Sequence, residues 1–199
     1  MIYKNKKIIF VEIGIQNGGS LDIWSEYFSN DSTIIGIDIN PECKKFERDN
    51  IKIFIGNQSD ENFWIDFFNK VGKVDIILDD GGHTNLDQIT TLVNCFKNIN
   101  DQGLFVTEDT HTSYIKDYNS DKKFSFINFS KKIIDDINFR YNEEFEKFNF
   151  SLNKHIYSVQ FFESIVAFEI DKKKCCLNNL LSNSGQDSKI TTLIKNFLL

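Results

Sequence analysis

The feature that most constrains this chain is a regular alternation, over its first 110 residues, of short apolar runs with stretches of helical periodicity. The runs are rich in β-branched residues and occupy positions 7–13, 33–38, 51–55, 74–78 and 103–107. Such runs suit strands that are buried on both faces, as in a parallel sheet. Helical spacing lies between them: Leu21, Trp24 and Phe28 follow the candidate cap Ser20, and Leu86, Ile89, Val93 and Phe96 follow Thr84 or Asn85. This alternation predicts a doubly wound α/β fold.

The pattern changes after Tyr114. Residues 126–137 carry apolar side chains at helical spacing, and residues 155–160 and 163–169 read as two neighbouring strands. We expect these strands to form an antiparallel hairpin at one edge of the sheet. A loop is expected over 177–186 and a terminal helix over 190–199. We expect one domain over 1–199, with a ligand-binding half at 7–115 and a substrate-side half at 116–199.

Composition excludes several classes of protein. The chain has 199 residues, 41% hydrophobic and 26% charged, with a formal net charge of −6. This balance fits a globular domain and opposes a nucleic-acid-binding surface, which needs clustered positive charge. No apolar run approaches the roughly 18 residues of a membrane span. The four cysteines form no C-x-x-C pair, which favours a reduced cytoplasmic protein.

In a doubly wound sheet, ligands bind beyond the carboxyl ends of the strands. After the first run comes a glycine-rich turn at 12–20, and the second run ends in Asp38. The turn is neither a G-x-G-x-x-G fingerprint nor a phosphate-binding P-loop. Asp38 is placed to accept ribose hydroxyls, although it also suits a helix cap. Together the two features indicate a nucleoside ligand without a pyrophosphate.

The third run is followed by Gln58, Ser59 and Asp60. These residues suit a loop that contacts adenine. Ser59 or Asp60 can equally cap the helix expected to begin near Glu61.

Acids and imidazoles follow the fourth and fifth runs: Asp79, Asp80 and His83, then Glu108, Asp109 and His111. Four carboxylates at one end of a sheet repel one another unless protons or a cation intervene. A hard divalent ion such as Mg²⁺, or Mn²⁺, is the simplest resolution, with solvated helix-capping acids as the alternative. His83 lies close enough to Asp80 to work beside a metal, and the role of His111 is less defined.

Four segments together resemble class I S-adenosylmethionine-dependent methyltransferases. They are 12–20 (EIGIQNGGS), 36–39 (GIDI), 79–83 (DDGGH) and 108–114 (EDTHTSY). The nearest branch is similar to the metal-dependent O-methyltransferases of macrolide sugars, which have relatives in polysaccharide gene clusters. The resemblance implies a Rossmann-like methyltransferase fold. Larger members carry an additional N-terminal domain, so it also implies that the chain either lacks this domain or is the catalytic portion of a longer protein.

The resemblance implies roles for the residues at the strand ends. The expected cofactor-binding residues are Glu12, Gly14, Gln16, Asn17, Gly18, Ser20, Asp38, Gln58, Ser59, Asp60 and Asp79. The turn would surround the methionine moiety, with Asp38 at the ribose. Asp80, Glu108 and Asp109 would bind the metal. His83 would be the general base, and His111 a second catalytic residue with an orienting role.

The expected activity is methyl transfer from S-adenosylmethionine to a sugar hydroxyl, on a nucleotide-linked sugar or a glycan or polysaccharide precursor. A methyltransferase acting on nitrogen or on a non-sugar molecule is the first alternative. A metal-dependent hydrolase is a second alternative, but such an enzyme has no use for the glycine turn and Asp38. A non-catalytic nucleoside-binding protein is a further alternative. We expect no nucleic-acid or membrane partner, and a homodimer is a candidate assembly.

Overall fold

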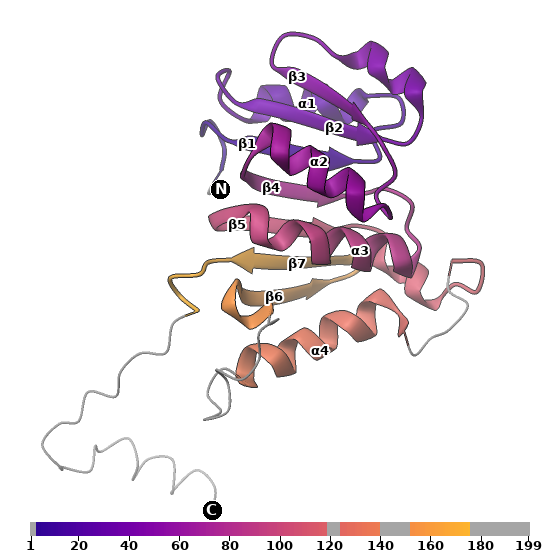
Figure 1. The fold of residues 1–199 in the computed structure, drawn as a ribbon, viewed down its shortest axis with the longest axis vertical. Coiled ribbons are helices and arrows are strands. Elements are labelled where there is room, and N and C mark those ends of the chain that lie inside the picture. Colours follow the sequence, from indigo (N-terminus) through magenta and orange to yellow (C-terminus); the bar gives the residue numbers. More distant parts are fainter. Residues whose placement is uncertain (1–2, 119–123, 140–151, 176–199) are drawn as a thin grey trace, which may run out of the picture.

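The computed structural model describes residues 3–118, 124–139 and 152–175, which form one seven-stranded sheet flanked by helices (Figure 1). The strand order is β3-β2-β1-β4-β5-β7-β6. The strands are β1 (Ile9–Ile13), β2 (Thr33–Asp38), β3 (Ile51–Ile55), β4 (Val74–Asp79), β5 (Ile99–Thr107), β6 (Ile156–Phe162) and β7 (Ile165–Ile170). The first five are parallel, whereas β7 is antiparallel to both β5 and β6. The doubly wound sheet and its antiparallel edge hairpin are therefore confirmed.

The described part of the chain has four α-helices, which cover the sheet: α1 (Gly19–Tyr27), α2 (Glu61–Val71), α3 (Asn85–Cys95) and α4 (Phe126–Phe139). Short 3₁₀ helices connect other elements: η1 (Pro41–Phe46), η2 (Phe96–Asn98), η3 (Thr110–Tyr114) and η6 (Leu152–Lys154). Figure 1 shows α2 and α3 in front of the sheet and α1 behind it. None of the described helices is long and apolar enough to cross a bilayer.

Each face of the sheet buries its own apolar cluster. On the α2 and α3 face, Trp64 and Phe67 of α2 and Leu92 of α3 pack on the central strands. On the α1 face, Leu21 and Phe28 pack with Phe10 of β1 and isoleucines of β2 and β3. Burial of the central strands on both sides explains their nearly continuous Ile and Val sequence.

Three local details differ from, or refine, the sequence-based expectations. The expected cap of α1, Ser20, is wrong: Gly18 is the N-cap, in a left-handed conformation (φ 72°), and Ser20 lies in the first turn. Of the two candidates for α3, Thr84 is the cap, because its side chain accepts a hydrogen bond from the Asp87 amide. Strand β5 begins at Ile99, four residues before the predicted run. The expected loop at 177–186 and terminal helix at 190–199 lie outside the described residues.

Candidate active site

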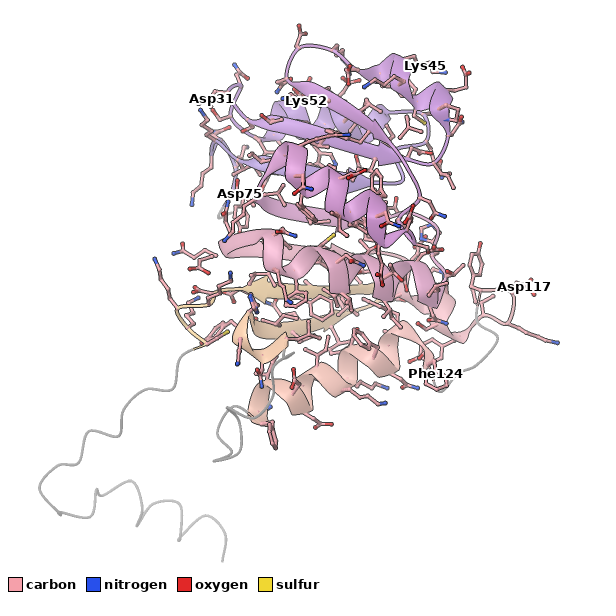
Figure 2. All side chains as sticks on the ribbon, in the orientation of Figure 1. Asp31, Lys45, Lys52, Asp75, Asp117 and Phe124 are labelled. Carbon is pink, nitrogen blue, oxygen red and sulfur yellow. The ribbon has the colours of Figure 1, made fainter. Side chains whose placement is uncertain are left out.

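The predicted site residues gather beyond the carboxyl ends of β1 to β5, around the point between β1 and β4 where the strand order reverses. Figure 2 shows Asp117 and Phe124 on this side of the molecule, and Asp31 and Asp75 on the opposite side. The connections after these strands therefore carry the candidate site.

The glycine turn after β1 packs directly on the connection after β4. Gly14 has φ 87°, and a methyl group added to it would overlap the backbone carbonyl of Asp80. Gly18 has φ 72°, and a methyl group there would press on the Phe46 ring. Both positions need glycine, because left-handed backbone and lack of space each exclude a side chain. The two glycines thereby let the turn pack closely on its neighbours.

Asp38, at the end of β2, fixes this turn. Its carboxylate accepts hydrogen bonds from the backbone amides of Gln16, at 3.0 Å, and Asn40, at 2.9 Å. The N-cap of η1 is Asn40, whose side chain accepts from the Glu42 amide. Asp38 therefore holds the turn and the start of the following connection, while its side chain remains half-buried at the cavity.

A cavity of about 400 Å³ opens between these elements. Its lining is Ile13, Gly14, Gln16, Ile37, Asp38, Ile39, Gly56, Asn57, Gln58, Asp80, Gly81, Gly82 and Asp87. Five predicted site residues thus line it directly: Gly14, Gln16, Asp38, Gln58 and Asp80. The apolar walls come from the ends of β1 and β2, and the polar floor comes from the connections after β3 and β4.

Other predicted cofactor residues lie beside the cavity rather than in its lining. Glu12 is buried and accepts a hydrogen bond from Ser20 Oγ at 2.8 Å, which ties β1 to the first turn of α1. Burial raises the pKa of Glu12, against the opposing effect of that hydrogen bond. Asn17 is exposed in the turn. Asp60 caps α2 by accepting a hydrogen bond from the Asn62 amide at 2.9 Å, which agrees with the alternative prediction that it caps this helix.

Asp79 is fully buried at the end of β4. Its Oδ1 accepts hydrogen bonds from Gln58 Nε2, at 2.9 Å, and the Gly81 amide, at 3.3 Å. Its Oδ2 has no hydrogen-bond partner among the described residues. Burial raises the pKa of Asp79 to about 7, and the two hydrogen bonds only partly oppose this effect.

Three side chains come together at the rim of the cavity. Ligand atoms of Asp80, His83 and Asp109 all lie within 4.8 Å of one another. His83 Nε2 is 3.8 Å from Asp109 Oδ2. Both His83 (φ 57°) and Asp109 (φ 51°) have left-handed backbone, which is uncommon for residues other than glycine. Such strain often marks functional sites, because the surrounding structure must hold it in place.

Burial and mutual repulsion disfavour the charged forms of the carboxylates at this rim. Partial burial raises the pKa of Asp80 and of Glu108. The negative charge of Asp109 raises both pKa values further, and that of Asp80 also raises the pKa of Glu108. His83 lowers the pKa of both acids. Glu108 therefore shares the field of Asp80 and Asp109, although it lies outside the group of three ligand atoms. Nearby negative charges of this kind favour a bound cation.

His111 lies on the solvent side of Asp109. Its Nδ1 is 2.7 Å from Ser164 Oγ and 3.8 Å from Asp109 Oδ1. Ser164 occupies the turn of the β6–β7 hairpin, and its carbonyl accepts a hydrogen bond from the Thr110 amide at 3.0 Å. Ser164 was not predicted as a site residue, because nothing local in the chain signals that this turn reaches the end of β5.

The comparisons with known proteins point in one direction. No family model matches the sequence. The sequence is 30% identical over 144 residues, 67% of this chain, to 8-demethyl-8-alpha-L-rhamnosyl tetracenomycin-C 2'-O-methyltransferase of Streptomyces olivaceus. It is 32% identical over 119 residues, 56% of this chain, to mycinamicin VI 2''-O-methyltransferase of Micromonospora griseorubida. The matches cover 37% and 29% of these two relatives, so the chain corresponds to about a third of their length.

A solved structure shares the fold across nearly the whole chain. It is the MycE methyltransferase from the mycinamycin biosynthetic pathway, in complex with Mg and SAH. The likeness has a TM-score of 0.81 at 21% identity and covers 98% of this chain and 52% of that one. The chain thus has the class I S-adenosylmethionine-dependent methyltransferase fold, and its sequence relatives are O-methyltransferases of macrolide and tetracenomycin sugars.

Proposed function

We propose that this protein is an S-adenosylmethionine- and Mg²⁺-dependent O-methyltransferase that acts on a sugar hydroxyl. The observation that carries the proposal is the double position of Asp80. This residue lines the 400 Å³ cavity, and it also belongs to the Asp80, His83 and Asp109 group at the rim. A nucleoside-sized cavity that shares a wall with a cluster of cation ligands suits transfer between a cofactor and a metal-oriented acceptor.

The cofactor would lie along the glycine turn. The turn leaves backbone close to the ligand at Gly14 and Gln16, and Asp38 offers carboxylate oxygens to ribose hydroxyls. The polar floor at Asn57 and Gln58 would border the adenine. The turn residues Asn17 and Gly18, together with the Glu12–Ser20 pair behind them, would shape the methionine end. Ser59, Asp60 and Asp79 would support the loops from outside the lining.

The residues at the rim fit a hard divalent cation. Asp80 and Asp109 supply carboxylate oxygens, which Mg²⁺ and Mn²⁺ prefer. Glu108 adds a third carboxylate, whose pKa is raised by partial burial and then by the negative charges of Asp80 and Asp109. An imidazole is a less suitable ligand for Mg²⁺, which leaves His83 available to act beside the cation.

In the reaction, a sugar hydroxyl oxygen forms a bond to the methyl carbon and the carbon–sulfur bond breaks. The sulfur keeps that electron pair, so S-adenosylhomocysteine is released. His83 accepts the hydroxyl proton as general base. A bound cation would make this proton easier to remove, as it does for metal-bound water. His111, beside Asp109, would orient the acceptor. Alignment of the two reactants supplies much of the remaining acceleration.

We further propose a nucleotide-linked sugar or a glycan or polysaccharide precursor as acceptor, a single domain with a cofactor half and a substrate-side half, and a cytoplasmic enzyme that forms homodimers. The Streptomyces olivaceus relative is named for a rhamnosyl substrate, which supports a sugar acceptor. Cys43 and Cys95 are buried free thiols, which favours a reducing compartment. The net charge of −6 favours a small-molecule partner over nucleic acid.

Calorimetry and a methyl-transfer assay test the proposal together. S-adenosylmethionine should bind, and transfer to one member of a panel of nucleotide sugars and glycosides should stop in EDTA and return with Mg²⁺ or Mn²⁺. Asp80→Asn should weaken Mg²⁺ binding and lower the rate, whereas the matched change Asp66→Asn, at an exposed position of α2, should change neither.

Three results would contradict the proposal in different ways. Failure to bind S-adenosylmethionine would point to a hydrolase or another nucleoside-binding protein. Full activity after exhaustive chelation would remove the metal. Transfer only to amines or non-sugar hydroxyls would assign another acceptor class.

A further inference from the structure

We propose that Gln58 is a positioning residue that couples the cofactor cavity to the placement of His83. The inference rests on the proposed function, and it assigns to Gln58 a task beyond contact with adenine. Gln58 belongs to the connection after β3, whereas His83 belongs to the connection after β4. The structure joins these two connections through one buried amide.

Every polar group of the Gln58 side chain is engaged. Its Nε2 donates to Asp79 Oδ1, at 2.9 Å, and to Thr91 Oγ1, at 3.0 Å. Its Oε1 accepts from the Gly82 amide at 2.7 Å. The side chain is buried, so breaking any of these bonds would leave an unsatisfied polar group. The amide therefore has one preferred orientation.

The Gly82 bond carries this constraint toward the rim. Gly82 directly precedes His83, whose left-handed backbone needs support from its surroundings. On the other side, Thr112 Oγ1 lies 2.8 Å from the carbonyls of both His83 and Asp109, which share its one proton. The His83 backbone is thus held between Gln58, through Gly82, and Thr112 of η3.

The turn also packs tightly against Gln58. A methyl group added to Gly81 would overlap Gln58 Oε1, and one added to Gly82 would overlap the Asp87 carboxylate. Asp87 accepts hydrogen bonds from Ser59, beside Gln58, and from Thr84, the cap of α3. The turn at 81–82 therefore packs on two side chains, Gln58 and Asp87. Gln58 belongs to the connection after β3, and Asp87 is hydrogen-bonded to Ser59 in that connection.

The same connection lines the cavity at Gly56, Asn57 and Gln58. A ligand that presses on or orders this connection would therefore act on the turn before His83 through a contact of 2.7 Å. Displacement of a catalytic group by about 1 Å can cost 10²-fold in rate. We infer that cofactor binding and correct placement of the His83 imidazole are energetically linked through Gln58.

Histidine NMR offers a direct readout, because the chain has only 3 histidines. In ¹⁵N-histidine-labelled wild-type protein, S-adenosylhomocysteine should shift the His83 imidazole signals. Gln58→Met preserves side-chain length and removes the donors and the acceptor. In this variant the cofactor product should still bind, with a Kd within about tenfold of wild type, while the shift at His83 should be lost or split among several states. The rate kcat should fall by about 10–100-fold, with a smaller change in acceptor KM.

Gln58→Glu retains the acceptor for the Gly82 amide, so it should recover part of the His83 response. Gln160→Met, at an exposed position of β6, is the matched control and should behave as wild type. Hydrogen exchange on the wild-type protein adds a measurement that needs no variant. The Gly82 amide should be protected, and S-adenosylhomocysteine should increase its protection.

Two results would overturn the inference alone: an unchanged His83 shift in Gln58→Met, or a Gly82 amide that exchanges as fast as an exposed one. Absence of S-adenosylhomocysteine binding to the wild-type protein would instead overturn the proposed function. The two failures are therefore distinguishable in one set of titrations.

Discussion

The imidazole of His111 and the hydroxyl of Ser164 lie 2.7 Å apart, although the two residues are 53 positions apart in the chain. The contact joins η3, which follows β5, to the turn of the β6–β7 hairpin. Since the hydrogen bond uses Nδ1 of His111, Nε2 is left to interact elsewhere. The hairpin thus orients an imidazole at the candidate site as well as completing the sheet.

Removal of this hydroxyl should affect acceptor binding more than chemistry. Ser164 has φ 61°, so Ser164→Gly removes the hydroxyl without adding backbone strain. We expect acceptor KM to rise by about 3–10-fold with kcat nearly unchanged, because an orienting contact is lost. In a double-mutant cycle with His111→Ala, the two effects should not add. Additive effects would show that Ser164 does not act through His111.

The two imidazoles at the rim should differ in kinetic effect. His83→Ala should lower kcat by about 10²-fold or more, as expected for loss of a general base, while S-adenosylmethionine affinity stays near wild type. His111→Ala should be milder and appear mainly in KM. Steady-state kinetics on both variants, with calorimetry for the cofactor, decide this. A silent His83→Ala would transfer the role of base to His111 or to a carboxylate.

Gly14 should tolerate no side chain. Gly14→Ala introduces strain at φ 87° and a clash with the Asp80 backbone. We expect the free energy of unfolding to fall by about 2 kcal/mol or more and cofactor binding to be severely weakened. Gly19→Ala is the matched control, because an added methyl there meets no atom within 4 Å. Denaturant titration and calorimetry on the pair test this, and equal behaviour of the two variants would refute the packing argument.

Asp38 should matter through charge as well as shape. Asp38→Ala removes two backbone contacts and the proposed ribose contacts, whereas Asp38→Asn keeps one acceptor oxygen. Each charge-assisted bond contributes roughly 1.5–3 kcal/mol, so we expect a large loss of S-adenosylmethionine affinity in the alanine variant and an intermediate loss in the asparagine variant. Unchanged affinity in the folded alanine variant would remove the ribose assignment.

His155, far from the candidate site, should make the fold sensitive to mild acid. Burial, followed by the positive charges of Lys172, Lys97 and Lys73, lowers the pKa of His155 to about 4. Because the unfolded chain binds this proton near pH 6.5 and the folded chain does not, stability should fall as pH drops from 6.5 toward 4. His155→Phe should keep the edge-to-face packing on Phe96 and remove this loss.

The comparison needs only unfolding free energies of the two proteins between pH 7 and pH 4. We expect the difference to reach about 1–2 kcal/mol, less than the full shift implies because water screens a partly buried ring. Parallel pH profiles for wild type and His155→Phe would contradict the assignment.

The sheet was predictable from sequence because its central strands are buried on both faces and therefore keep nearly continuous apolar runs. Strand β5 shows the limit of this rule. Its first residues, Ile99–Gln102, are mostly polar, so the predicted run begins only at Gly103. The start of α1 was misplaced for a different reason. A left-handed glycine begins that helix, and the space beside it is filled by Phe46, which lies in another element.

At the site, the residue types predicted which side chains lie close together, but not which of them form hydrogen bonds with one another. Clustering of Asp80, His83 and Asp109 followed from their places at strand ends. The partners of Gln58 did not, because its side chain bonds to residues 21 and 33 positions away. Hydrogen bonds across several elements depend on the folded arrangement of helices and strands, and no periodic pattern records them.

The position of β7 between β5 and β6 affects how the sheet forms while the protein is being synthesised. Strands β1 to β5 can pair as they leave the ribosome, but one edge of β5 is satisfied only by residues 166–170 of β7. Until those residues emerge, the nascent chain carries an open strand edge next to Phe105, which the finished sheet buries completely. Such an edge is a template for association with other chains. The hairpin that covers this edge also brings Ser164 to His111, so pairing of β7 with β5 removes an open edge and places a partner beside this imidazole in one step.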